Sequence, residues 1–138
     1  MIRIFALTDA GARLGKRLKT LLLTKDPHTL VSFELKPQPF AKTVQTAFTR
    51  EERLILICAT GIAVRTLAPV LLDKYRDPAV LVLDEQGQFV IPLLSGHEGG
   101  ANEWGRQVSD LLDAQLAMTT AQPYLQPVYT VGMGCERG

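Results

Sequence analysis

The chain has 138 residues, which is enough for one domain with a hydrophobic core. Apolar residues make up 46% of it and charged residues 21%, and the net charge of +1 argues against a general nucleic-acid binder. Charged residues interrupt every apolar run before it reaches membrane-spanning length, and no signal-peptide pattern opens the chain, so we expect a cytoplasmic protein with no membrane and no nucleic acid among its partners.

Strand-like and helix-like patterns alternate along the chain. Short apolar runs predict strands at residues 2–8, 29–35, 53–60, 79–85, 88–94 and 114–120. Apolar residues at helical spacing predict helices at 9–23, 40–50 and 99–113, and a shorter helix within 61–67. A further turn is expected to start at Pro69, because proline disrupts a helix interior. The strands at 79–85 and 88–94 are close enough in sequence to form a hairpin through the turn "EQGQ".

Strands that alternate with helices are typical of a mostly parallel sheet with helices on both faces. We therefore predict an α/β fold with three layers, α/β/α, of the Rossmann-like or flavodoxin-like kind. Residues 1–121 form this domain. Residues 122–130 are predicted to be a linker and strand entry, and residues 131–138 the start of a truncated second domain, because a proline-marked stretch leads into an apolar run and a glycine turn with no helix behind it.

Three glycine-containing junctions follow predicted strands: "LTDAGARLG", "CATGIAVR" and "LLSGHEGGAN". In open α/β sheets, ligands bind beyond the carboxyl ends of the strands, so we expect these junctions to lie together at one edge. Glycine lets the backbone approach a ligand closely, and the N-terminus of a helix offers unpaired N–H groups. The sequence therefore predicts a rim that binds carboxylates or phosphates.

The junction "CATGIAVR" supplies three candidate substrate-binding residues, Thr60, Gly61 and Arg65. Arg65 follows Gly61 by about one helical turn, near enough to reach an anion held there. The alternative is structural. In that case Thr60 caps the helix, Gly61 lets the turn close and Arg65 is an ordinary surface residue.

The junction "LLSGHEGGAN" contains the best candidate for proton transfer, His97, because imidazole is the side chain that titrates near neutrality. Asn102, about one turn later, is a candidate catalytic residue that would orient the imidazole. The candidate substrate-binding residues of this junction are Ser95, Gly96, Gly99 and Gly100. The alternative is again structural, because Ser95 and Glu98 have the spacing of a helix capping box and the glycines would allow close helix packing.

Other chemistries fit the sequence less well. The segment "GARLGKR" is one residue too short for a phosphate loop and lacks the Ser or Thr that would bind magnesium, and its basic residues are typical of a solvated helix face. The histidines and cysteines show no metal-ligand spacing, so no metal site is predicted. Cys58 is expected to pack as a small apolar residue at a strand end, and Trp104 to belong to the core.

Residues 59–105 resemble the N-terminal domain of the CbiG family, the cobalt-precorrin-5A hydrolases of anaerobic cobalamin biosynthesis. The phrases that carry the resemblance are "TGI-VR--AP", "DPAV-V-DE-G-FVIPLLSGH-GGAN" and "TTA", of which SGH-x-GGAN is the most specific. The terminal "VGMGCERG" resembles the opening of the family's C-terminal domain, which is related to CobE. Residues 1–50 carry little of the resemblance beyond "MIRIFALTDAGARLGKRL".

The resemblance implies hydrolysis of the ring A δ-lactone of cobalt-precorrin-5A with release of acetaldehyde, which gives cobalt-precorrin-5B. The cobalt is carried by the substrate, so no cofactor of the protein is expected. For this reaction His97 is the candidate base, and N–H groups near Gly61, Gly99 and Gly100 are candidate donors to the oxyanion or to substrate carboxylates. The expected partners are the cobalt-precorrin tetrapyrrole and neighbouring methyltransferases of the corrin pathway.

Two other functions stay open at this point. In the first, the domain is a non-catalytic module that binds the tetrapyrrole or a partner enzyme, while the chemistry lies in the missing C-terminal domain and this fragment alone is inactive. In the second, the domain is a small nucleotide-binding regulator. The first strand is not followed by G-x-G-x-x-G, which weakens a dinucleotide reading.

Overall fold

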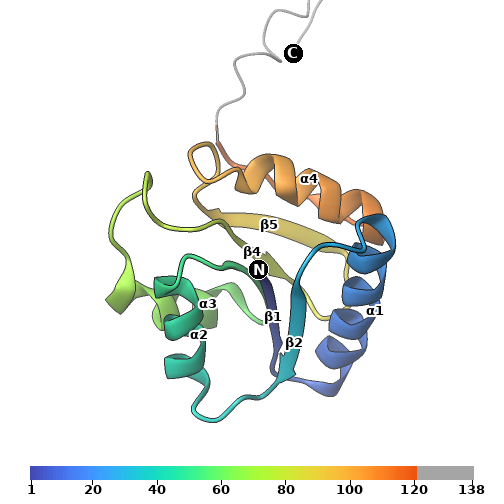
Figure 1. Ribbon diagram of the computed structural model, residues 1–138, viewed down its shortest axis with the longest axis horizontal. Coiled ribbons are helices and arrows are strands. Elements are labelled where there is room, and N and C mark those ends of the chain that lie inside the picture. Colours follow the sequence, from blue (N-terminus) through green and yellow to red (C-terminus); the bar gives the residue numbers. More distant parts are fainter. Residues whose placement is uncertain (121–138) are drawn as a thin grey trace, which may run out of the picture.

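The computed structural model describes residues 1–120, in which six strands form one sheet in the order β2-β1-β3-β4-β5-β6 (Figure 1). The elements, in chain order, are β1 (Ile2–Ala6), α1 (Asp9–Lys25), β2 (Val31–Leu35), α2 (Phe40–Thr49), β3 (Arg53–Ile57), α3 (Thr60–Leu67), the 3-10 helix η1 (Ala68–Val70), β4 (Val80–Leu83), β5 (Phe89–Leu94), α4 (Ala101–Leu112) and β6 (Gln115–Leu116). The predicted linker at 122–130 and the predicted second-domain start at 131–138 lie outside the described residues.

The two faces of the sheet are covered by different helices (Figure 1). On one face, Leu18 of α1 and Val108 of α4 join side chains of β1, β3 and β4 in the larger core. On the other face, Val44 and Phe48 of α2 and Leu67 of α3 pack against the same three strands. The predicted three-layer α/β/α fold is therefore confirmed. Strands β1 and β3 are neighbours, but α1, which follows β1, and α3, which follows β3, cover opposite faces of the sheet. This arrangement creates the crevice where such sheets bind ligands.

The sheet is mostly parallel and contains one reversal of direction. Strands β1 to β4 run parallel, whereas β5 pairs antiparallel with β4. The reversal follows from the short β4–β5 connection, because parallel neighbours need a crossover of about a dozen residues or more. The Asp84 carboxylate orders this turn by accepting the backbone N–H groups of Gln86, Gln88 and Phe89. The predicted hairpin is confirmed.

Most of the predicted elements are present, and the main differences are at the starts of two helices and in β6, which covers Gln115–Leu116 where a strand at 114–120 was predicted. The short helix ends at Leu67 before a turn that contains Pro69, as predicted. Its N-cap is Ala59, so Thr60 is not the capping residue. Trp104 is 5% exposed and belongs to the core, as predicted. None of the helices within residues 1–120 has the length and hydropathy needed to cross a bilayer.

The loop formed by residues 95–100 folds over the amino end of α4 and occupies its N–H groups. Four N–H groups donate to carbonyl oxygens of this loop at 3.0 to 3.3 Å, namely Gly99 to Ser95, Gly100 to His97, Ala101 to Ser95 and Asn102 to Gly96. The helix begins at Ala101, two residues later than predicted. The expected bare N–H groups at Gly99 and Gly100 are therefore not there, because backbone carbonyls already accept them.

Ser95 and Glu98 do not form the capping box that their spacing suggested. The Ser95 hydroxyl donates to the Asp77 carbonyl oxygen at 2.8 Å, which ties the loop to the start of β4. The N-cap of α4 is Gly100, whose φ of 80° is a left-handed conformation that glycine adopts most readily. A Cβ on Gly99 would lie 2.5 Å from the Ser95 Cβ. The glycines of this loop are thus required by its own backbone geometry.

We predict that Gly99→Ala lowers the free energy of unfolding by about 1–3 kcal/mol, because the added Cβ overlaps Ser95 and the loop must shift. His97→Ala is the matched control from the same loop. The His97 side chain is exposed, so this variant should stay within about 0.5 kcal/mol of the wild type. Urea unfolding followed by circular dichroism measures both variants. An unchanged midpoint for Gly99→Ala would contradict the close approach.

Candidate functional site

The three glycine junctions lie at two edges of the sheet. We call the edge where β1, β3 and β4 end the carboxyl edge, and the edge where they begin the amino edge. Because β5 is antiparallel to β4, with Leu94 paired to Val80 and Val90 to Leu83, the end of β5 lies at the amino edge. The junctions after β1 and β3 share the carboxyl edge, whereas "SGHEGGAN" lies at the amino edge. The prediction of one shared rim is therefore wrong, and the hairpin is the reason.

The separation divides the predicted site residues into two groups. Thr60, Gly61 and Arg65 lie at the carboxyl edge. The residues that lie at the amino edge are Ser95, Gly96, His97, Gly99, Gly100 and Asn102. A strand of five residues such as β3 spans about 16 Å. His97 therefore cannot contact a small group that is held by Gly61 and Arg65.

The start of α3 combines uncapped N–H groups with a guanidinium. The Ile62 and Ala63 N–H groups donate to the Ala59 carbonyl oxygen, and in the described part of the chain no side chain caps the preceding two N–H groups, those of Thr60 and Gly61. Arg65 folds back over this end, because its Nη1 lies 3.4 Å from the position that a Cβ on Gly61 would occupy. The positive end of the helix dipole adds to the charge. This arrangement suits a carboxylate or phosphate.

A pocket of about 250 Å³ opens beside the start of α3, over the carboxyl end of β3. It lies in the crevice between α1 and α3, which follow β1 and β3 and cover opposite faces of the sheet. Most of its lining is apolar, with a hydroxyl and two carboxylates: Leu7, Thr8, Ile57, Cys58, Ala59, Ile62, Asp84 and Glu85. An apolar pocket with few polar groups is the usual form of a small-molecule site.

A hydrogen bond between Thr8 and Glu85 closes one side of this pocket. The Gly11 N–H donates to the Thr8 Oγ at 3.0 Å, and the Thr8 hydroxyl donates to the Glu85 Oε1 at 2.7 Å. Because β3 lies between β1 and β4, this bond spans the end of β3. Asp84 is engaged by the hairpin turn, so Glu85 is the carboxylate placed for pocket chemistry. The sequence reasoning missed Thr8 and Glu85, although the predicted hairpin implied that its turn lies at the carboxyl edge.

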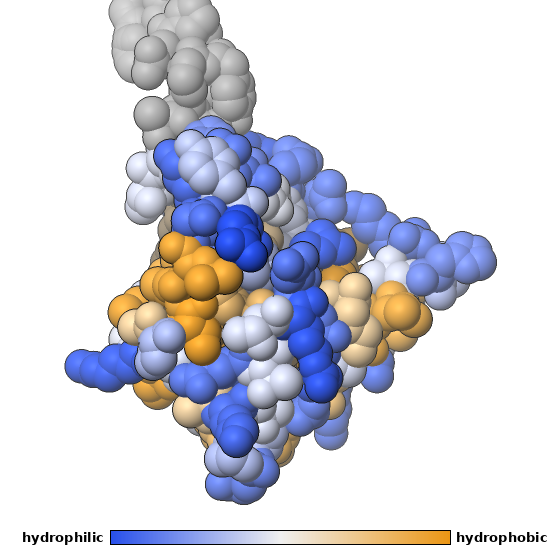
Figure 2. Space-filling view, turned by 60° about the vertical axis from the view of Figure 1, so that its left-hand side comes forward, coloured by the Kyte–Doolittle hydropathy of each residue, from blue (hydrophilic) through white to orange (hydrophobic). Residues whose placement is uncertain are grey.

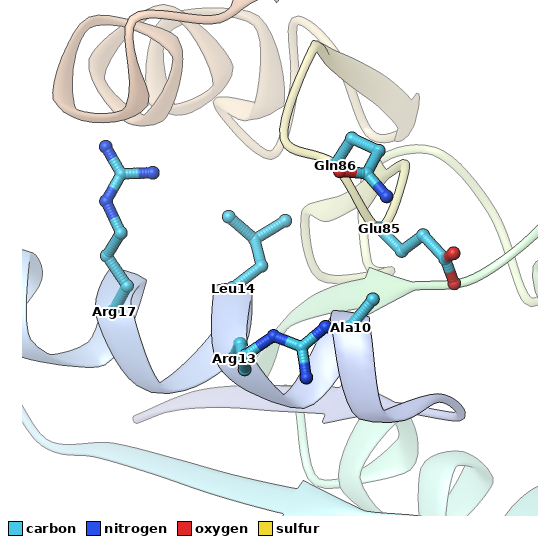
Figure 3. Close-up of a pocket in the computed structure, with 6 residues that line it drawn as sticks. All are labelled: Ala10, Arg13, Leu14, Arg17, Glu85 and Gln86. Carbon is cyan, nitrogen blue, oxygen red and sulfur yellow. The ribbon is translucent and has the colours of Figure 1, made fainter.

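A second pocket, of about 230 Å³, shares Glu85 with the first. Figure 3 shows Leu14 and Arg17 rising from α1 and Arg13 lying along it, with Glu85 and Gln86 of the hairpin turn on the other side. The two arginines are exposed and one helical turn apart, so they give this pocket a positively charged wall. Arg13 and Arg17, which were predicted to lie on a solvated helix face, therefore also border this pocket.

At the amino edge, His97 and Asn102 have different surroundings. His97 is exposed at the tip of the loop. Asn102 is only 8% exposed, and its Nδ2 donates to the Thr120 Oγ1 at 2.8 Å. Its side chain thus ties α4 to the end of the described chain, rather than orienting the imidazole as expected. Gly96 packs against it, because a Cβ on Gly96 would lie 3.0 Å from the Asn102 Oδ1.

Cys58 lines the pocket but is not activated. Burial raises the pKa of the Cys58 thiol to about 11, and a hydrogen bond with the Ala63 backbone offsets this only in part. The thiol is therefore neutral at pH 7, and the residue packs at the strand end as predicted. Within residues 1–120, no group of three His, Cys, Asp or Glu side chains is arranged to hold a metal ion.

Comparison with known proteins identifies relatives of this chain. A family model described as cobalamin synthesis G N-terminal matches residues 42–122, more than half of the chain. A cobalt-precorrin-5A hydrolase from Salmonella typhimurium is 48% identical over 124 residues, which cover 87% of this chain and 35% of that protein. A protein of the same name from Priestia megaterium is 37% identical over 128 residues, which cover 86% of this chain and 34% of that protein.

A solved structure has the same fold. The crystal structure of a cobalamin biosynthesis protein G homolog from Sulfolobus solfataricus superposes with a TM-score of 0.75 at 24% identity, covering 86% of this chain and 36% of that one. The chain thus spans about a third of the length of the proteins that it matches. Since the family model covers more than half of its residues, the chain belongs to the cobalamin synthesis G N-terminal family.

Proposed function

We propose that this chain is the N-terminal domain of a cytoplasmic cobalt-precorrin-5A hydrolase that acts in cobalamin biosynthesis. The observation that carries this proposal is the 48% identity over 124 residues to a curated protein of that name. Because the chain spans only a third of that relative, the activity is proposed for the whole protein. Methyltransferases of the corrin pathway remain its proposed partners.

The reaction opens a lactone and then breaks a carbon–carbon bond. Water adds to the carbonyl carbon of the ring A δ-lactone, the ring C–O bond breaks, and a carboxylate and a hydroxyl group form. The hydroxyl group then loses its proton, the bond to the two-carbon fragment breaks, and acetaldehyde leaves. The conjugated macrocycle takes the electron pair. The cobalt belongs to the substrate, and we propose no cofactor of the protein.

The carboxyl edge is the part of this domain that best fits such a substrate. The acetate and propionate arms of a cobalt-precorrin are carboxylates, and the start of α3 offers the N–H groups of Thr60 and Gly61 together with the Arg65 guanidinium. Glu85, held by Thr8 at the neighbouring pocket, is the side chain placed to take a proton from water. In this assignment the domain binds the substrate at the carboxyl edge and contributes an acid–base group.

One observation favours a second function, in which this domain only binds the tetrapyrrole and the chemistry lies in the rest of the protein. The N–H groups of Gly99 and Gly100, which were expected to serve an oxyanion near His97, are hydrogen-bonded to carbonyl groups of their own loop.

His97 is the alternative to Glu85 as the general base. This assignment requires a reaction site at the amino edge that other parts of the protein complete.

A chimera tests the proposed activity. We predict that this chain, when it replaces the matched region of the Salmonella typhimurium relative, supports release of acetaldehyde from cobalt-precorrin-5A, because the two sequences are 48% identical over 124 residues. A coupled assay with alcohol dehydrogenase and NADH measures acetaldehyde, with the parent relative as the positive control. A folded chimera without turnover, beside an active parent, would contradict the proposal. Turnover by this chain alone would exclude the binding-only function.

Single substitutions in the chimera locate the substrate. We predict that Arg65→Ala raises KM about 10- to 100-fold, because the substrate carboxylate loses a charged donor, and that Arg65→Lys restores part of the loss. Arg50→Ala removes an equal charge from an exposed position at the end of α2 and should leave KM unchanged. We expect His97→Ala to keep kcat within about threefold. A large fall in kcat for His97→Ala with an unaffected Arg65→Ala would instead place the reaction at the amino edge.

A further inference from the structure

The segment between η1 and β4 exposes three large apolar side chains close together in the sequence. Leu71 is 44% exposed, Leu72 68% and Tyr75 70%. Figure 2, turned so that this side of the molecule comes forward, shows apolar side chains gathered in patches among charged ones. Single exposed apolar residues are ordinary, whereas a patch rimmed by polar groups is typical of an interaction site. We call Leu71, Leu72 and Tyr75 the 71–75 surface.

Hydrogen bonds hold this surface in a defined conformation. The Asp77 carboxylate accepts the Leu72 N–H at 3.1 Å, and the Asp73 carboxylate accepts the N–H groups of Tyr75 and Arg76 at 2.8 and 3.0 Å. The backbone that carries the exposed apolar side chains is therefore held in one conformation by these hydrogen bonds. Such preorganisation favours binding, because little conformational entropy remains to be lost.

The 71–75 surface lies at the amino edge, where the chain also leaves the described region. Asp77 precedes β4, and its carbonyl oxygen accepts the Ser95 hydroxyl at 2.8 Å. Asn102, at the base of the same loop, donates to Thr120, the last described residue. Figure 1 shows that the described part of the chain ends beside this loop. Thr120 is thus linked through Asn102 to the loop at 95–100, and the same loop is linked through Ser95 to Asp77, two residues after Tyr75.

We infer that the 71–75 surface is where the remaining two thirds of the full-length protein pack against this domain. The relatives are about three times longer than the matched region, so they contain a large additional part outside it. Leu71, Leu72 and Tyr75 form the apolar centre of this interface, and charged neighbours such as Lys74 and Arg76 form its rim. This inference rests on the length of the relatives and not on the proposed activity.

Docking at the amino edge leaves the carboxyl edge open to the substrate. It also covers the loop that contains His97 and Glu98, whose exposed side chains then face the rest of the protein. A second copy of this chain is the competing occupant of the surface. The two occupants differ in a measurable way, because only self-association depends on the concentration of the isolated chain.

Cysteine labelling with a matched control tests the interface. Leu71→Cys and Phe89→Cys replace residues of almost equal exposure, 44% and 43%, at opposite edges of the sheet. Both are made in a Cys135→Ser background, where Cys58 reacts slowly because the pKa of its buried thiol is about 11. In the isolated chain we expect both cysteines to react with a maleimide at comparable rates. In the chimera described above we expect the rate at position 71 to fall at least tenfold and the rate at position 89 to stay unchanged.

Two outcomes overturn the inference. Equal rates at position 71 in the chain and in a folded chimera would show that the surface stays free. Slow labelling in the isolated chain that dilution relieves would assign the surface to a second copy. If the chimera does not fold, the two cysteines are introduced at the aligned positions of the Salmonella typhimurium relative. Their labelling rates in that protein are then compared with each other. Labelling does not require turnover, so a protected position 71 in an inactive chimera would contradict the proposed activity alone.

Discussion

The reversal of chain direction between β4 and β5 decides where the candidate residues of this protein lie. Asp84 stabilises the reversal, because one carboxylate accepts three backbone N–H groups of the turn. The turn brings Glu85 to the carboxyl edge, within hydrogen-bond distance of Thr8. The same reversal carries the loop at 95–100 to the amino edge, about one strand length away.

The two glycine-containing helix starts show how similar sequences give opposite chemistry. α3 begins almost directly after β3, with Ala59 as an N-cap that has no side-chain oxygen, so its first N–H groups stay uncapped. α4 is preceded by a longer loop whose glycines let the backbone curl over the helix end and place its carbonyls on the N–H groups. The glycine-containing loop therefore closes the start of α4, whereas the start of α3 stays uncapped because Ala59 has no capping side chain.

The two edges of the sheet consequently have different characters. The carboxyl edge combines an apolar pocket, a helix start and arginines on α1 and α3, a combination that suits a large acidic molecule. The amino edge combines an ordered apolar surface with the exit of the chain, a combination that suits packing against protein. A single domain with separate faces for ligand and for protein can be joined to a larger partner domain without blocking its own pocket.

Sequence alone determined the layers of this fold, because the periodicity of apolar residues shows which face of a strand or helix is buried. Leu18, Val44 and Val108 lie in the cores as their spacing indicated, and the hairpin was visible in its turn residues. Tertiary structure alone decided which junctions meet, since the contact between Thr8 and Glu85 joins residues 77 positions apart. It also decided which N–H groups are free, because every residue type except proline carries the same N–H, and only the folded backbone determines which carbonyl accepts it.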